Sequence, residues 1–190
     1  VFDEAGSLQP KARWAYSSIE PLFDALRRHE NLSAEQYWLF GHSAGAQFVH
    51  RFVMLGVAQR MVAAISANAG SYMFPVNDVD WPFGLRGAPK GGDAGIFASP
   101  MVLMLGDADS DPNHRSLPRQ PAAMAQGPHR YARGQNFYGT SRQIAERTGQ
   151  TFNWSCVIVP GVAHDNAGIA RAAIRIIKGW KPTPGADCAP

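Results

Sequence analysis

The sequence predicts an α/β fold: a mostly parallel sheet flanked by helices, in one domain spanning residues 1–190. Three observations support this class. Short apolar runs alternate along the chain with segments of helical periodicity, the order expected of a parallel sheet covered by helices. A pentapeptide of small residues joins one of these runs directly to a helix. With 45% apolar residues among 190, the chain has enough apolar material for one core.

The expected elements follow one another in a regular order. They are a helix over 14–29 with Pro21 at a restart or kink, a strand over 37–40, a helix over 46–55, strands over 62–67 and 100–105, a helix over 136–149, a strand over 156–159 and a helix over 167–180. The helices carry apolar residues at intervals of three and four. The run at 100–105 is apolar throughout, as in a sheet buried on both faces.

Two long segments lack such periodicity. Residues 71–99 are rich in Gly, Pro and Asp and also hold aromatic residues, and we expect a cap-like loop insert there. Its aromatic side chains either line an acyl or aryl pocket or pack the loop on its own scaffold. Residues 112–135 form a basic loop. No acidic residue occurs from 112 to 145, where the sequence has Arg115, Arg119, Arg130, Arg133 and Arg142. These arginines either belong to a solvated basic loop or attract an anionic substrate, and we favour the solvated loop.

The pentapeptide Gly41-His42-Ser43-Ala44-Gly45 lies between an apolar run and a helix. Gly-x-Ser-x-Gly at a strand-to-helix junction holds the serine in a strained backbone conformation with its Oγ exposed. Gly41 and Gly45 have no Cβ atom, and we expect that a Cβ at either position would collide as strand and helix approach each other. We expect the Ala44 N–H to stabilise an oxyanion. The alternative is a glycine-rich turn with a chance serine. The context on both sides favours a nucleophile.

A serine hydroxyl needs a histidine to take its proton and a carboxylate to orient that histidine. Three aspartates, Asp107, Asp109 and Asp111, follow the strand at 100–105, and catalytic groups gather at the carboxyl ends of parallel strands. We prefer Asp109, because the pattern Gly-x-x-Asp lets the chain turn once and bring the carboxylate back. Asp111 is the second choice and Asp107 the third. Turn and cap roles are expected for the remaining two.

His164 is the expected base, because it follows the last strand and precedes the last helix, where the chain order Ser, Asp, His places it. The ring of His42 is expected to point away from the serine Oγ. The other histidines lie on expected helices or in the basic loop, where ordinary structural or solvated roles are favoured: His29, His50, His114 and His129.

Four stretches resemble the α/β-hydrolase superfamily and, more narrowly, bacterial esterases related to poly(3-hydroxyalkanoate) depolymerases. They are the twelve residues 41–52, Asn68-Ala69-Gly70, Trp81-Pro82-Phe83-Gly84-Leu85 and Gly106-Asp107-Ala108-Asp109. The resemblance implies an α/β-hydrolase fold with Ser43, Asp109 and His164 as nucleophile, acid and base. A serine mechanism with these three residues needs no metal and no organic cofactor. The candidate substrate-binding residues are His42, Tyr72, Trp81 and Phe83.

The chain departs from this resemblance at its start. The implied fold has about four strands before the nucleophile, whereas Ser43 is preceded by one expected helix and one expected strand. We therefore expect the C-terminal part of such a domain. A missing N-terminal segment, or a separate chain, would complete the sheet beside the strand that carries Ser43 and supply a second oxyanion donor.

These residues predict a serine hydrolase that cleaves a small-molecule or polymeric carboxylic ester. Transfer of the acyl group to another acceptor, cleavage of an amide, and a non-catalytic binding scaffold of the same fold are the alternatives. A net charge of +3 is too small to indicate nucleic acid, and no run is long enough to cross a bilayer. Cys156 and Cys188 either form one disulfide or stay free. Pairing would favour a secreted or periplasmic location for this soluble chain.

Overall fold

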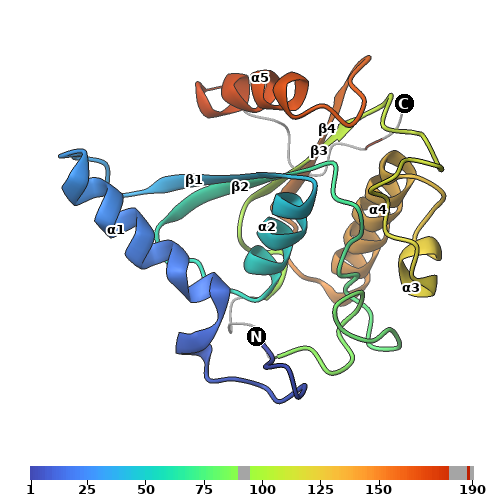
Figure 1. The fold of residues 1–190 in the computed structure, drawn as a ribbon, viewed down its shortest axis with the longest axis horizontal. Coiled ribbons are helices and arrows are strands. Elements are labelled where there is room, and N and C mark those ends of the chain that lie inside the picture. Colours follow the sequence, from blue (N-terminus) through green and yellow to red (C-terminus); the bar gives the residue numbers. More distant parts are fainter. Residues whose placement is uncertain (90–94, 180–187, 189–190) are drawn as a thin grey trace.

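The computed structural model describes residues 1–89, 95–179 and 188, and its framework is one parallel sheet. Its strands are β1 (Tyr37–His42), β2 (Met61–Ala67), β3 (Met101–Gly106) and β4 (Trp154–Val159), which lie side by side in that order (Figure 1). All three pairings are parallel. The strand predictions are therefore confirmed to within two residues, together with the parallel class.

Helices cover both faces of the sheet. In Figure 1, α5 (Asn166–Ile177) lies on one face, while α2 (Ala44–Met54) and α4 (Arg130–Thr148) lie on the other. The helix α1 (Ile19–His29) flanks the β1 side. Shorter helices complete the fold: α3 (Pro121–Met124) and two 3-10 turns, Lys11–Arg13 and Ala15–Ser18.

Successive residues of the strands enter opposite layers of the core, because side chains alternate between the faces of a sheet. Ile65 and Met104 pack with Ile169 of α5, whereas Leu103 and Leu105 pack with Phe137 of α4. Both faces are thus buried, which explains why β3 reads as a continuous apolar run.

The first predicted helix, at 14–29, is divided. Its start forms a 3-10 turn at Ala15–Ser18, and α1 begins at Ile19. Pro21 lies in the first turn of α1, where a missing N–H removes no helical hydrogen bond. The restart interpretation of Pro21 is therefore confirmed.

The helix predicted at 136–149 begins earlier, at Arg130. The His129 ring caps its first turn by accepting a backbone N–H. Gly134 lies where α4 crosses the sheet, and a Cβ there would collide with the Leu105 side chain. The arginine- and glycine-rich start lacks apolar periodicity, so its pattern did not reveal the helix. The predicted helix end at 180 and residues 90–94 of the loop lie outside the described residues.

The described part of the 71–99 loop packs on its own scaffold. Phe74 donates its N–H to the Phe83 carbonyl (2.8 Å), and Leu85 donates to Val76 (2.8 Å). Phe97 is fully buried in the core. A cap-like role for this loop stays a prediction.

The solvated interpretation of the basic loop at 112–135 is wrong for two of its arginines. Arg115 and Arg119 are exposed, but Arg130 and Arg133 are 1% and 0% exposed. The Arg133 guanidinium donates to three backbone carbonyls, among them that of Gly70 (2.6 Å). Arg133 therefore ties α4 to the loop that follows β2.

The strand β1 lies at one edge of the sheet, with β2 as its only strand partner in the described part of the chain. Its outer edge presents backbone groups that lack a ladder partner, and such an edge favours pairing with another strand. The open edge agrees with the expectation that the strand carrying Ser43 lacks a neighbour. Within the described residues, no helix is both long and apolar enough to cross a membrane.

A cluster around Glu20 joins α1 to the start of the sheet and predicts an acid-sensitive stability. Burial opposes ionisation of Glu20, but hydrogen bonds from the Gln59 N–H (3.0 Å), the Tyr37 hydroxyl (2.7 Å) and Arg60 (2.7 Å) outweigh it. They lower the pKa of Glu20 to about 2. Because the folded pKa lies below the unfolded one, the stabilisation is present above about pH 4.5 and is lost as pH falls toward 2.

The free energy of unfolding of the wild type, measured in urea, should therefore fall by up to about 2 kcal/mol more between pH 6 and pH 3 than that of Glu20→Gln. Parallel pH dependences in the two proteins would show that Glu20 does not carry this effect.

Cys156 of β4 and Cys188 form a disulfide over a sequence separation of 32 residues. Closing a loop of this length restricts the unfolded chain, so Cys188→Ser is expected to lower the free energy of unfolding by about 3 kcal/mol. Urea denaturation of both proteins under oxidising conditions measures the difference. Reduction of the wild type should produce a similar loss, and equal midpoints in all three samples would contradict the prediction.

Candidate active site

The structure brings Ser43, Asp109 and His164 together in one hydrogen-bonded chain. The Ser43 Oγ lies 3.0 Å from Nε2 of His164, and Nδ1 of the same ring lies 2.7 Å from Oδ2 of Asp109. The three residues follow β1, β3 and β4, whose carboxyl ends meet at one edge of the sheet. This is the arrangement that activates a serine nucleophile in hydrolases.

Ser43 occupies a strained turn between β1 and α2. Its backbone has φ 58° and ψ −116°, which L-residues rarely adopt. A Cβ at Gly41 would collide with the Gly45 carbonyl, so the expectation for Gly41 is confirmed. The expectation for Gly45 is wrong, because a Cβ there would meet no atom within 4 Å. Gly45 lies on the exposed first turn of α2, where the described residues leave open space.

Ala44 is the first residue of α2 and is exposed. Its N–H has no carbonyl one turn earlier in the helix with which to pair, and the N-terminus of a helix carries partial positive charge. The N–H is thus available to an oxyanion formed beside Ser43, the position that the sequence analysis assigned to it.

The three aspartates after β3 have different partners. Asp109 is buried, and its N–H donates to the Gly106 carbonyl (3.1 Å), which forms the single turn expected from Gly-x-x-Asp. Asp107 accepts the Gly161 N–H (2.7 Å). Asp111 is exposed and accepts a backbone N–H two residues later (2.8 Å). Only Asp109 contacts His164 among the three. Asp111 has the expected turn role, whereas Asp107 joins the loop after β3 to the turn after β4.

Two backbone ties fix the segments that carry Asp109 and His164. The Asn68 amide accepts the N–H of Gly106 (2.8 Å) and donates to the Ala163 carbonyl (3.2 Å), which joins the ends of β2 and β3 to the residue before His164. Asp165 caps α5 by accepting two backbone N–H groups (2.8 and 3.0 Å). These hydrogen bonds lower the pKa of Asp165. The sequence analysis gave neither residue a supporting role.

The His164 ring contacts two other imidazoles. Its centroid is 4.7 Å from that of His42 and 5.1 Å from that of His114, the latter edge to face. His42 therefore contacts the triad, and its Nε2 is buried without a hydrogen-bond partner in the described part of the structure. Burial lowers the pKa of His42, and the charge of a protonated His164 would lower it further.

His114 is a partly exposed loop residue, and its contact with His164 goes beyond the solvated role expected for it. Burial and the neighbouring Arg130 charge lower the pKa of His114. Despite these neighbouring histidines, no group of three or more His, Cys, Asp or Glu side chains in the described residues is arranged to hold a metal ion.

Asp109 has a second buried partner that the sequence analysis missed. Nη1 of Arg130 lies 3.3 Å from Oδ1 of Asp109, and both side chains are almost fully buried. Twenty-one residues separate the two positions. Nothing in the local pattern distinguishes Arg130 from the exposed arginines of the same loop.

The remaining substrate-binding candidates lie in different surroundings. Tyr72 is 0% exposed and stacks on Phe137 (4.6 Å between ring centroids), so it belongs to the core and not to a substrate surface. Trp81 is partly buried and packs near Phe2 (6.0 Å). Of the four candidates, only Phe83 lines the cavity described next.

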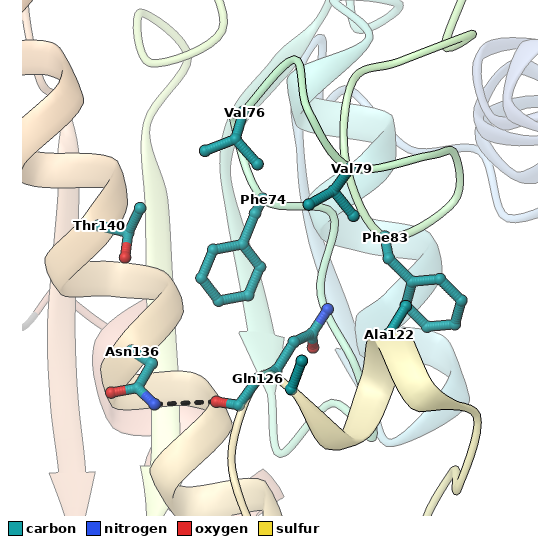
Figure 2. Close-up of a pocket in the computed structure, with 9 residues that line it drawn as sticks. Phe74, Val76, Val79, Phe83, Ala122, Gln126, Asn136 and Thr140 are labelled. Atoms are coloured by element: carbon teal, nitrogen blue, oxygen red, sulfur yellow. Dashed lines mark hydrogen bonds between the residues drawn. The ribbon is translucent and has the colours of Figure 1, made fainter.

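This cavity has a volume of about 310 Å³ and lies between the 71–99 loop, α3 and α4. Figure 2 shows Phe74, Val79 and Phe83 on one side, and Asn136 and Thr140 of α4 on the other. Its lining carries no charged side chain and includes no residue of the triad. The full lining is Phe74, Val76, Val79, Phe83, Ala122, Ala125, Gln126, Asn136 and Thr140.

Two solved structures match this chain closely. Poly(aspartic acid) hydrolase-1 from Sphingomonas sp. KT-1 is 42% identical, with a TM-score of 0.87 over 93% of this chain and 68% of that one. LpqC, a poly(3-hydroxybutyrate) depolymerase from Bordetella parapertussis, is 36% identical, with a TM-score of 0.85 over 96% of this chain and 62% of that one. No protein-family model matched the sequence, and no curated protein did.

The chain spans about two thirds of the length of both proteins, 68% of one and 62% of the other. The matched region includes nearly all of this chain, at an identity well above the level at which only a fold is shared. Given this similarity and the parallel sheet with its serine turn, the chain belongs to the α/β-hydrolase family that includes poly(aspartic acid) hydrolase-1 and the poly(3-hydroxybutyrate) depolymerase LpqC.

Proposed function

We propose that this protein is a serine hydrolase that cleaves a carboxylic ester through an acyl-enzyme on Ser43. The observation that carries the proposal is the continuous hydrogen-bonded chain from Ser43 through His164 to Asp109, built on a strained strand-to-helix turn. The relatives' names, a hydrolase and a depolymerase, support the same class of reaction.

In the proposed reaction, the Ser43 Oγ attacks the acyl carbon while His164 Nε2 accepts its proton. His164 then donates that proton to the leaving alcohol as the ester bond breaks. Water attacks the acyl-enzyme in the second half, with His164 again as base, which releases the acid and restores Ser43. Asp109 holds the ring and offsets its charge, and the Ala44 N–H donates to the oxyanion.

A second oxyanion donor is needed for full activity in this mechanism. We propose that the open edge of β1 takes a further strand, from the same or another polypeptide, and that the loop after that strand supplies the donor. The exposed first turn of α2 and the greater length of the two relatives support this. One missing donor typically lowers kcat by about 10²–10³-fold, so the 190-residue chain alone should be slow.

The substrate proposed first is an ester of an uncharged, apolar acyl group, in a small molecule or in a polyester. The uncharged cavity that Phe83 lines supports this choice. A second candidate is an anionic polymer, because Arg115 and Arg119 are exposed on the segment that carries His114, and one relative is a poly(aspartic acid) hydrolase. In that case, the triad would cleave an amide.

A substrate panel tests both candidates. It contains p-nitrophenyl esters of increasing acyl length, a succinyl ester, poly(3-hydroxybutyrate) and poly(aspartic acid), each assayed with the wild type and Ser43→Ala. The first proposal expects the highest kcat/KM on a neutral ester and weak dependence on salt. Preference for the anionic substrates, abolished by salt, would favour the second candidate. Turnover of none of them by the wild type would contradict both.

The disulfide between Cys156 and Cys188 indicates the cellular compartment in which the protein acts. Because disulfides persist in oxidising compartments, we propose that the protein acts outside the cytoplasm, in the periplasm or after secretion. Thiol titration of the protein isolated from its native source should find Cys156 and Cys188 oxidised. Two free thiols there would contradict the proposal.

A further inference from the structure

The buried guanidinium of Arg130 calls for an explanation beyond packing. Removing a charged side chain from water is costly unless partners compensate, and Arg130 is 1% exposed. Its neighbour on α4, Arg133, is equally buried but pairs with backbone carbonyls around loop turns. Arg130 contacts side chains at the triad instead.

The two terminal nitrogens of Arg130 reach different parts of the site. Nη1 donates to Oδ1 of Asp109 (3.3 Å), which leaves Oδ2 to His164 (2.7 Å). Nη2 donates to the Ser116 hydroxyl (3.0 Å) and lies 3.4 Å from Nδ1 of His114. One planar group thus holds both the acid of the triad and the segment that bears His114.

The contact between Arg130 and His114 also affects the position of His164, the proposed base. Nδ1 of His114 also receives the N–H of Ser116 (3.3 Å), so this nitrogen is an acceptor and the ring is fixed by its surroundings. The fixed ring packs edge to face on His164 at 5.1 Å, and His42 makes a further ring contact with His164 at 4.7 Å. The His164 ring is therefore held by ring contacts as well as by its hydrogen bond to Asp109.

We propose that Arg130 is a positioning residue of the triad: it fixes the Asp109 carboxylate and the His114–Ser116 pair together, and so holds the His164 ring in line with Ser43. This inference rests on the proposed serine hydrolase function for its effect on turnover, but its geometry is independent of the substrate. Arg130 acts through its neighbours, because its hydrogen bonds go to Asp109, His114 and Ser116.

Three variants separate positioning from stability. Arg130→Met removes the charge and the planar guanidinium, Arg130→Lys keeps the charge alone, and Arg133→Met removes an equally buried arginine whose hydrogen bonds go to loop carbonyls and to Met124. For Arg130→Met, kcat on the best ester should fall by about 10–100-fold with KM nearly unchanged. Arg130→Lys should show a partial loss of kcat, also with KM nearly unchanged. Arg133→Met should lower the melting temperature but change neither kcat nor KM.

A second readout needs no turnover. The ring signals of His114, followed by NMR against pH, should titrate at higher pH in Arg130→Met than in the wild type, because Arg130 lowers the pKa of His114, and they should be unchanged in Arg133→Met. If the wild type hydrolyses nothing, the proposed function fails while this titration still tests the contact. An unchanged His114 titration, or a kcat no different from that of Arg133→Met, overturns the proposal. If Arg130→Met does not fold, Arg130→Lys decides: a wild-type kcat overturns it, and a loss of kcat with KM nearly unchanged supports it.

Discussion

Ser43→Ala is expected to lower kcat for ester hydrolysis by about 10⁴–10⁶-fold, because no other group at the site can form the acyl-enzyme. The fold should be unaffected, since alanine removes only the hydroxyl that faces His164 at 3.0 Å. Steady-state hydrolysis of the best ester from the panel, with a melting curve for each protein, measures both effects.

The matched control is Ser110→Ala, which removes an exposed hydroxyl beside Asp109 in the chain. Its kcat should equal that of the wild type. Normal hydrolysis by Ser43→Ala would show that the activity comes from elsewhere in the chain or from a contaminant.

Asp109→Asn is expected to lower kcat by about 10³–10⁴-fold, because an amide cannot stabilise the imidazolium or hold the ring in the required tautomer. It should also destabilise the fold by about 3–5 kcal/mol, since the buried Arg130 would lose its counter-charge. Hydrolysis kinetics and urea denaturation provide the two readouts.

Asp111→Asn is the control, because Asp111 is exposed and contacts only the loop. It should retain wild-type kcat and stability. A large loss of kcat in Asp111→Asn together with an active Asp109→Asn would reverse the choice between the two aspartates.

Local sequence patterns were sufficient to predict the sheet and to single out Ser43, Asp109 and His164, which the structure joins by hydrogen bonds. The apolar runs of β2 and β3 are buried on both faces, so their composition alone marks them as strands of a parallel sheet. Ser43 is identified by a turn that requires small neighbours, and His164 by its place between the last strand and the last helix. Each of these signals comes from a few consecutive residues.

The surroundings of the triad could not be predicted in this way, because they depend on tertiary approach. Arg130 reaches Asp109 only because α4 begins next to the loop after β3, and its sequence context matches that of the exposed Arg115. Tyr72 is an aromatic residue of the type that lines binding sites, but the structure places it in the core. The expectation for Gly45 failed for a related reason: space beside it depends on what lies next to β1, which no local pattern shows.

The most direct test of an activated Ser43 is its reaction with a fluorophosphonate probe, which needs the nucleophile and its base but no particular substrate. The folded wild type should gain one adduct by intact mass, and peptide mapping should place it on Ser43. Ser43→Ala should gain none, and Asp109→Asn should react much more slowly. A folded wild type that stays unlabelled, or an adduct that persists in Ser43→Ala, would contradict the assignment of Ser43 as the nucleophile.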